Sequence, residues 1–322
     1  MTQNVTENPD IIALQPRLHD SDAAVRRIAL IDLADLEEPE ALPWLTNSLL
    51  EDNNDQVREE AARLLAAWEE SDVIAALCHA LTDEKQNVRE AAAESLTQLK
   101  IPASGLSILP WVTHADSSVG RRALRALREL RLPESAEPAL HALNHTDARV
   151  RREAVGVLAW LKHKPALTEL AKLASGDPDV DVRRAATGAL GFSANPQLLP
   201  ALYRALQDSQ WQVREEAAAT LGKLGFKDAG SELILALGDN YWQVRLQAVR
   251  ALGKLRFNPA NAALITLLSH SISNLRKEAA LALGELGDHH ALLALRNAEQ
   301  DADPEVRKAV RIALVQLSGR IA

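Results

Sequence analysis

The residues that could coordinate a metal or act as a nucleophile are few in this sequence of 322 residues. It has nine histidines and a single cysteine, Cys78, so neither a disulfide nor a multi-thiolate metal site can form within one chain. No phosphate-binding glycine loop, nucleophile elbow or zinc-protease motif occurs. We therefore predict that the protein is not an enzyme and that it carries no cofactor or metal.

Most of the other side chains that are suited to binding a partner belong to tryptophan and arginine. Only 3% of the residues are aromatic, yet six of these eleven are Trp. Residues 1–100 contain 8 Lys and Arg against 21 Asp and Glu, a net charge of −13, whereas residues 101–322 carry +5. This division favours an asymmetric protein partner, or head-to-tail self-association, over a nucleic acid.

A repeat of about 31 residues determines how these side chains are positioned. The dipeptide Val-Arg, or a close variant, recurs at steps of 31 or 32 residues, and we call its second position the marker. The markers are Arg26, Arg58, Arg89, Gly120, Arg151, Arg183, Arg214, Arg245, Arg276 and Arg307. A repeat with this period indicates a stack of units, each of which buries its apolar face against its neighbours.

Each repeat is predicted to be a pair of helices. In the seventh repeat, Asn195 caps a first helix that ends at Leu206, and a second helix runs from about Trp211 to Leu224 and stops at Gly225. Apolar residues three and four positions apart form one stripe along the second helix. No segment alternates with a period of two, so we predict an all-α fold.

Two further regularities accompany the marker. A turn Asp precedes it by six residues in seven repeats, and a small residue, Gly or usually Ala, follows it by eight. The small residue is expected to let the helices of adjacent repeats approach closely. The turn residues are Asp20, Asp52, Asp83, Asp177, Asp208, Asp239 and Asp301.

This pattern resembles HEAT repeats, specifically the short variety known from phycobilisome bilin lyases. The resemblance implies a right-handed α-solenoid in which the turn Asp and the marker Arg bond from one repeat to the next. It also implies one domain over residues 1–322, with about ten repeats. Their expected ranges are 8–37, 38–69, 70–100, 101–131, 132–162, 163–194, 195–225, 226–256, 257–287 and 288–318. A HEAT-repeat hydroxylase family holds two irons with His-Glu pairs, but no histidine here is followed by Glu.

The fourth repeat breaks the pattern three times. His114 replaces the turn Asp, Gly120 replaces the marker Arg, and Arg128 replaces the small residue. A glycine inside a helix costs about 0.5–1 kcal/mol relative to alanine. The two open interpretations are drift in a tolerant scaffold and a kink or loosened joint with a function. His145 and His270 replace the turn Asp in repeats five and nine, which keep their marker Arg and are expected to be milder departures.

Several arginines and tryptophans are predicted to share one face of the second helices. By the resemblance these helices line a concave groove, and the positions opposite the apolar stripe should face it. Trp211 and Trp242 lie one repeat apart and are expected to stack. The alternative is that the arginines pair with neighbouring Glu and the tryptophans cover helix ends. The predicted partner-binding residues are Arg121, Arg122, Arg125, Arg152, Trp160, Arg184, Trp211, Trp242, Arg250 and Lys254.

The sequence leaves three functions to compare. The first is a non-enzymatic scaffold or adaptor that binds a protein or peptide in the groove through rigid anchor residues. The second, implied by the bilin-lyase resemblance, is an assembly or maturation factor that holds an apoprotein while a cofactor is attached. Nucleic-acid binding comes third, because residues 1–100 are strongly acidic. The first residues lack a signal peptide and no apolar run reaches 18 residues, so we expect a cytoplasmic protein without a membrane segment.

Overall fold

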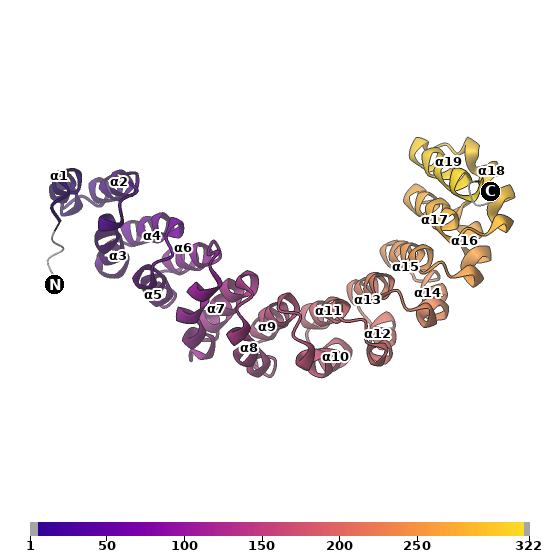
Figure 1. Ribbon diagram of the computed structural model, residues 1–322, viewed down its shortest axis with the longest axis horizontal. Helices are drawn as coiled ribbons and strands as arrows, with labels where there is room; N and C mark the ends of the chain where they lie inside the picture. Colours follow the sequence, from indigo (N-terminus) through magenta and orange to yellow (C-terminus); the bar gives the residue numbers. More distant parts are fainter. Residues whose placement is uncertain (1–5, 319–322) are drawn as a thin grey trace. The chain divides into compact units, whose positions relative to one another are not determined.

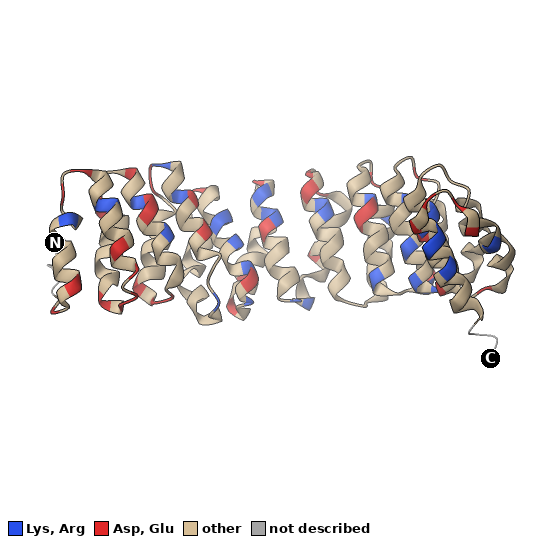
Figure 2. Ribbon diagram, turned by 90° about the horizontal axis from the view of Figure 1, so that it is seen from above, with Lys and Arg blue, Asp and Glu red and all other residues tan. Residues whose placement is uncertain are grey.

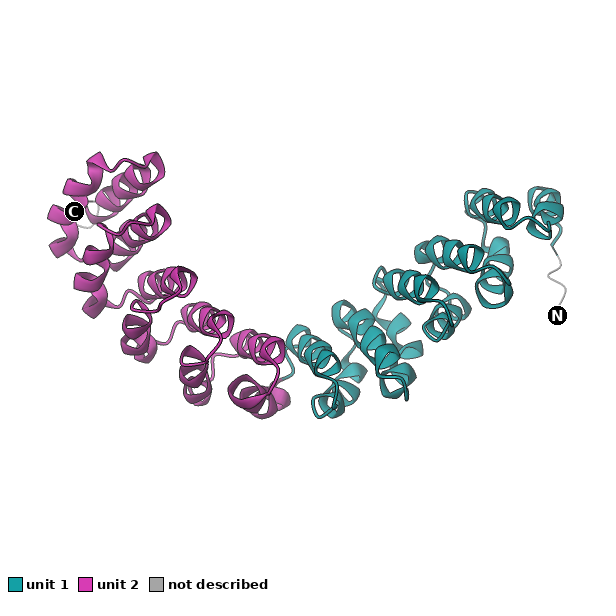
Figure 3. Ribbon diagram, turned by 180° about the vertical axis from the view of Figure 1, so that it is seen from behind, with its two compact units in different colours: residues 1–163 teal, residues 164–322 magenta. Residues whose placement is uncertain are grey.

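The computed structural model describes residues 6–318, and in that range the chain forms helices and turns without any strand. Its residues cluster into two compact units, Met1–His163 and Lys164–Ala322 (Figure 3). An all-α fold is thereby confirmed. The prediction of a single domain over 1–322 stays a prediction, and each unit has its own pair of layers.

Unit 1 has two layers of helices (Figure 1). The first helices of its pairs are α1 (Pro9–Leu18), α3 (Leu42–Glu51), α5 (Ser71–Ala80), the 3-10 helices η3 (Pro102–Ser107) and η4 (Leu109–Thr113), and α8 (Ala136–Ala142). The second helices are α2 (Ala23–Ala34), α4 (Asp55–Leu64), α6 (Gln86–Leu96), α7 (Ser117–Leu130) and α9 (Ala148–Trp160). Each second helix packs on its own first helix and on the second helices of neighbouring repeats.

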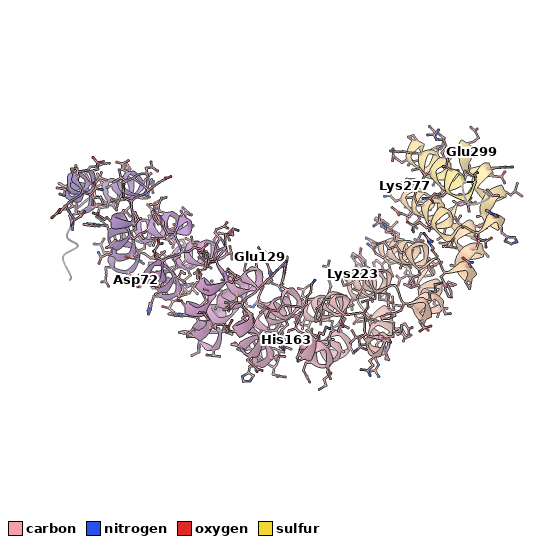
Figure 4. All side chains as sticks on the ribbon, in the orientation of Figure 1. Asp72, Glu129, His163, Lys223, Lys277 and Glu299 are labelled. Atoms are coloured by element: carbon pink, nitrogen blue, oxygen red, sulfur yellow. The ribbon has the colours of Figure 1, made fainter. Side chains whose placement is uncertain are left out.

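Unit 2 repeats this arrangement. Its first helices are α10 (Leu167–Gly176), α12 (Leu199–Leu206), α14 (Gly230–Ala236), α16 (Asn261–Leu267) and α18 (Leu292–Asn297). Its second helices are α11 (Val180–Ala189), α13 (Trp211–Leu224), α15 (Trp242–Leu255), α17 (Ser273–Leu286) and α19 (Pro304–Ser318). Lys223 and Lys277 project from the second-helix layer (Figure 4).

The expected helix boundaries of the seventh repeat are confirmed. Asn195 accepts a hydrogen bond from the backbone N–H of Gln197 and so caps a 3-10 turn that leads into α12. The second helix, α13, ends at Leu224, because Gly225 follows it with φ 76°, a conformation that favours glycine. Within the apolar stripe of α13, Val213 and Leu221 are fully buried.

Short 3-10 turns open most first helices, and proline explains several of them. Pro39, Pro133 and Pro196 each occupy the first position of such a turn, where a missing N–H leaves no hydrogen bond unmade. In the fourth repeat the whole first segment is 3-10, with Pro102 opening η3 and Pro110 in η4. The segment that packs on α7 is therefore a 3-10 helix, whereas the regular second helices pack on an α-helix.

Glycines in the second-helix layer of unit 2 allow adjacent helices to touch backbone to backbone. A Cβ atom on Gly222 would lie 2.9 Å from the Cα of Ala251 in α15, and one on Gly284 would lie 2.8 Å from the Cα of Ala313 in α19. Real Cβ atoms do not approach other carbons so closely. The expected close approach at the small residue is confirmed.

A ladder of ion pairs joins successive repeats, as the resemblance implied. In each complete rung, the guanidinium of a marker Arg donates two hydrogen bonds to the carboxylate of the next turn Asp. It also donates a third, from an Nη atom, to the backbone carbonyl of the turn residue in its own repeat. The rungs are Arg26–Asp52, Arg58–Asp83, Arg183–Asp208, Arg214–Asp239 and Arg276–Asp301, with shortest N–O distances of 2.6–2.8 Å.

The rung carboxylates make stability depend on pH. Burial alone would raise the pKa of Asp83, but hydrogen bonds from Arg58 and from the Lys85 N–H outweigh it and hold that pKa below its ordinary value. The hydrogen bonds from Arg276 lower the pKa of Asp301 in the same direction. A lowered folded-state pKa stabilises the fold above the unfolded-state value of about 4. That contribution is lost as the pH falls through the folded-state pKa.

We expect the urea midpoint of unfolding to be constant near neutral pH and to fall steeply below about pH 4. The arginines stay charged throughout this range, so the change reports the aspartates. Far-ultraviolet circular dichroism, recorded during urea titrations at a series of pH values, measures the midpoint. A midpoint that does not change down to about pH 3, roughly one unit below the unfolded pKa, contradicts the prediction.

Candidate functional site

The centre of the candidate site is the second-helix layer of unit 1 around α7. Arg121, Arg122, Arg125 and Arg128 lie on α7 and Arg152 lies on the adjacent α9; we call these five the arginine cluster. Arg125 and Arg152 are exposed and the other three are partly exposed. Glu129 of α7 projects from the second-helix side, away from Asp72 of the first-helix layer (Figure 4). Charged residues of both signs lie along the helices of the chain (Figure 2).

Three members of the arginine cluster have carboxylate neighbours. Arg125 lies 3.7 Å from Glu94 of α6. Glu153 of α9 is almost fully buried and lies 3.5 Å from Arg128 and 3.2 Å from Arg152. These contacts link α7 to α6 and to α9. For these three arginines, the alternative interpretation, in which arginines pair with neighbouring glutamates, is correct.

The other two members, Arg121 and Arg122, have no carboxylate within 4.0 Å among the described residues. The Nε atom of Arg121 is buried and has no hydrogen-bond partner. Burial, followed by repulsion from Arg121 and Arg89, lowers the pKa of Arg122. A group of guanidinium ions that repel one another in a partly dry position is a place where a negative ligand is stabilised.

Arg89 contributes to this charge because the rung that it would begin has no acceptor. Its Nη1 donates to the backbone carbonyls of Asp83 and Glu84, but the next turn has His114 instead of Asp. The backbone N–H of Asp116 donates to His114 Nδ1 at 3.1 Å, so the imidazole keeps the local role of the turn Asp without its charge. The Trp111 ring stacks on that of His114, with 5.8 Å between centroids.

The irregular residues of the fourth repeat have packing roles. A Cβ atom on Gly120 would lie 2.6 Å from the carbonyl oxygen of Val112, so the 3-10 segment η4 fits on α7 only above a glycine. The stem of Arg128 lies over Gly156 of α9, where a Cβ atom would be 2.9 Å from Arg128 Cδ. Repeat four has Arg128 where other repeats have a small residue, and Gly156 of repeat five provides the space for it.

Trp160 at the end of α9 is 45% exposed, and the guanidinium of Arg131 lies 5.1 Å from its ring centroid. Arg131 itself ends α7 in the left-handed conformation, with φ 53°. A half-exposed indole with a cation over it extends the surface of the arginine cluster. Trp160 was predicted from the sequence, which contains no comparable signal for Arg131.

In unit 2 the predicted cations have acidic partners. Arg184 lies 3.8 Å from Glu216, and Arg250 donates a hydrogen bond of 2.8 Å to Glu278. Arg250 and Lys254 of α15 line an open pocket of about 340 Å³ together with Glu278 and Glu285 of α17. Burial raises the pKa of Glu285 despite the nearby Lys254. The charges of this pocket balance one another, unlike those around Arg121.

The aromatic residues of unit 2 form a different pair from the expected one. Trp211 stacks on Tyr241, with 5.5 Å between ring centroids and an angle of 15° between the ring planes, and Arg214 lies 5.8 Å from the same Tyr241 ring. The prediction that Trp211 stacks on Trp242 was therefore wrong. Tyr241 immediately precedes α15 and so reaches back towards α13, which leaves Trp242 37% exposed.

Cys78 is fully buried in α5, and burial raises the pKa of its thiol to about 12. Among residues 6–318, no three His, Cys, Asp or Glu side chains are grouped so that they could hold a metal ion. No helix in that range is long and apolar enough to cross a membrane.

Helix pairs joined by an Arg–Asp ladder define a helical repeat protein. Family models described as HEAT repeats match residues 44–109, 105–190, 167–234 and 230–315. The chain therefore belongs to the HEAT-repeat family, and its fold is an all-α solenoid. Nothing in these matches distinguishes the phycobilisome-lyase variety from other HEAT repeats.

Solved structures support the fold, and one curated relative is similar over part of the sequence. YibA from Escherichia coli is 21% identical, with a TM-score of 0.55 over 93% of this chain and 99% of that one. Kap95p, which binds RanGDP, is 16% identical, with a TM-score of 0.61 over 98% of this chain and 50% of that one. Deoxyhypusine hydroxylase from Drosophila pseudoobscura pseudoobscura is 33% identical over 96 residues. That match covers 29% of this chain and about a third of the relative.

Proposed function

We propose that the protein is a non-enzymatic interaction scaffold that binds a protein or peptide through the second-helix face of unit 1. The arginine cluster, with Trp160 beside it, is the contact surface, and the partner presents carboxylates to it. A second, separate contact surface lies on the second-helix face of unit 2 and consists of Arg184, Trp211, Trp242, Arg250 and Lys254.

The observation that carries the proposal is a pair of guanidinium ions on α7 that have no carboxylate within 4.0 Å among the described residues. Arg121 and Arg122 are adjacent, partly buried and close to a third arginine, Arg89, whose rung lacks an acceptor. Structural arginines of this protein bind aspartate through two hydrogen bonds, as the rungs show. Arginine and tryptophan are also the residues most enriched at energetic centres of protein interfaces.

The fold suits such a role because rigid stacked helices lose little entropy on binding. Kap95p, a HEAT-like solenoid with a similar fold, binds RanGDP. The likeness concerns the fold alone, so the chemistry of the partner is inferred from the arginine cluster of this chain.

Arg121→Glu together with Arg125→Glu is expected to lower capture of the partner at least about tenfold, because two attractive contacts become repulsive. The test begins with affinity purification from a native lysate and identification of a stoichiometric protein, and then measures its binding to the double variant. The far-ultraviolet circular dichroism should not change.

A matched control places the same change in charge on the first-helix layer. Lys172→Glu with Arg204→Glu alters two exposed residues of α10 and α12. Capture should persist in this control and weaken with added salt in the wild-type protein. Full capture by the Arg121→Glu, Arg125→Glu variant would show that the partner binds elsewhere.

A further inference from the structure

Four of the five marker arginines in unit 2 bind the backbone of their own turn. Arg183, Arg214, Arg276 and Arg307 each donate a hydrogen bond from Nη1 to a turn carbonyl six residues earlier, at 2.6–2.9 Å. The first three of these also bind the aspartate of the next turn through two nitrogen atoms. A marker guanidinium is therefore normally saturated with acceptors.

The fifth, Arg245, is different. Its guanidinium has no hydrogen bond or ion pair among the described residues, and its Nε atom is buried without an acceptor. The turn carboxylate of its own repeat, Asp239, already accepts two hydrogen bonds from Arg214 and one from the Tyr241 N–H. The residue as a whole is partly exposed, so its side chain is open to a ligand.

His270 accounts for the missing rung of Arg245, because it occupies the turn position at which the other rungs have an aspartate. The missing bond to the carbonyl of its own turn is a separate feature, since Arg89 keeps that bond although it also precedes a turn histidine. The backbone N–H of Ile272 donates to His270 Nδ1 at 3.0 Å, so the neutral imidazole carries its proton on Nε2. It can then only donate there, and Arg245 gains no acceptor from it. Burial and the adjacent Arg245 and Arg276 lower the pKa of His270.

Two exposed aromatic side chains stand close to Arg245 in the chain. Trp242 lies three residues before it on α15, on the same side of the helix, and Tyr241 precedes Trp242 directly. They are 37% and 46% exposed. An unpaired guanidinium binds a carboxylate, and aromatic side chains on the same side of the helix can pack against an apolar side chain. The combination therefore favours a peptide segment that has an acidic residue next to an apolar one over a small inorganic ion.

We infer that Arg245, His270 and Trp242 form a carboxylate-binding site in unit 2, and that its ligand is an Asp or Glu side chain flanked by apolar residues in a peptide. The ligand supplies to Arg245 the carboxylate that an aspartate of the next repeat supplies in the complete rungs, and it does so beside the imidazole of His270. This site deepens the proposed function, because it gives a scaffold a second anchor for an acidic segment. It involves residues different from the arginine cluster, so each can be tested alone.

The decisive variant is His270→Asp, which restores the acceptor that the other rungs have. Arg245 should then bind the introduced carboxylate internally, so the urea midpoint of unfolding should rise and the site should be closed. Binding is followed by nuclear magnetic resonance of the arginine Nε–H groups during addition of sodium acetate at constant ionic strength. The Arg245 resonance is identified by its loss in Arg245→Lys, and Arg214, already paired, serves as the internal control.

Acetate should shift the Arg245 resonance in the wild-type protein, leave Arg214 unchanged and have no effect on Arg245 in His270→Asp. No response in the wild-type protein, or an equal response in both proteins, would overturn the inference. A second titration uses a short peptide with one aspartate between two leucines, and its asparagine counterpart. Binding of the aspartate peptide at least about tenfold tighter than acetate identifies a peptide ligand. Equal affinity identifies free carboxylates as the ligand and overturns the assignment to a peptide.

Discussion

Asp83→Ala is expected to lower the free energy of unfolding by about 3–5 kcal/mol, the cost of leaving one partner of a buried ion pair without the other. The side chains of Arg58 and Asp83 are only 9% and 12% exposed, and two hydrogen bonds join them. Arg58 would keep its bond to the Asp52 carbonyl but lose both carboxylate contacts. Urea unfolding followed by circular dichroism measures the loss.

The first repeat supplies a matched control for this change. Asp20 holds the same turn position and accepts a hydrogen bond from the Asp22 N–H, just as Asp83 accepts one from Lys85. No marker arginine precedes Asp20, so Asp20→Ala removes the turn contact alone. We expect it to cost about 1 kcal/mol. Equal losses in the two variants would mean that the rung adds nothing to stability.

Gly222→Leu is expected to destabilise unit 2 by about 3 kcal/mol or more, because the added side chain has no room. Even a Cβ atom there would meet the Cβ and Cα of Ala251 at 2.8 and 2.9 Å, and backbone cannot move aside as a flexible side chain can. The helices α13 and α15 would have to separate, which opens the buried stripe between them. The midpoint of thermal unfolding should fall accordingly.

Gly176→Leu is the control for that variant. Gly176 ends α10, is exposed, and has no atom within 4 Å of the position of a Cβ atom. The same substitution there should change stability by no more than about 0.5 kcal/mol. If both leucine variants unfold at the same temperature, the contact between α13 and α15 does not require a glycine.

The regular parts of the fold could be predicted because each depends on residues at a fixed spacing. The Asp and the marker Arg of each complete rung recur in the sequence and meet in the structure, as Arg214 and Asp239 show. Helix ends were equally predictable where a local signal decides them, as at Gly225.

The irregular parts depend on contacts between residues that follow no spacing rule. The room that Gly156 makes for Arg128 depends on a neighbouring repeat, and the clash at Gly120 depends on the 3-10 path of η4. Trp211 stacks on Tyr241 and not on Trp242, because Tyr241 immediately precedes α15 and its ring lies towards α13.

The effect of a histidine in the turn also falls on a different repeat from the one that contains it. His270 was expected to be a mild departure because its own repeat keeps Arg276, and that arginine does complete its rung with Asp301. The residue that loses its acceptor is Arg245, the marker of the preceding repeat. A comparison of residues within one repeat overlooks this loss, because each rung is made of two repeats.

The histidine junctions have a consequence for how such a chain can be rearranged. A break between two repeats joined by a complete rung would sever the ion pair of that rung, as between Arg214 and Asp239. The boundary between the repeats of Arg245 and His270 has no rung to sever, since histidine replaces the carboxylate there. At this boundary, blocks of repeats can be deleted, duplicated or exchanged without removing the aspartate partner of a marker arginine. Lengthened or shortened variants should therefore be built there.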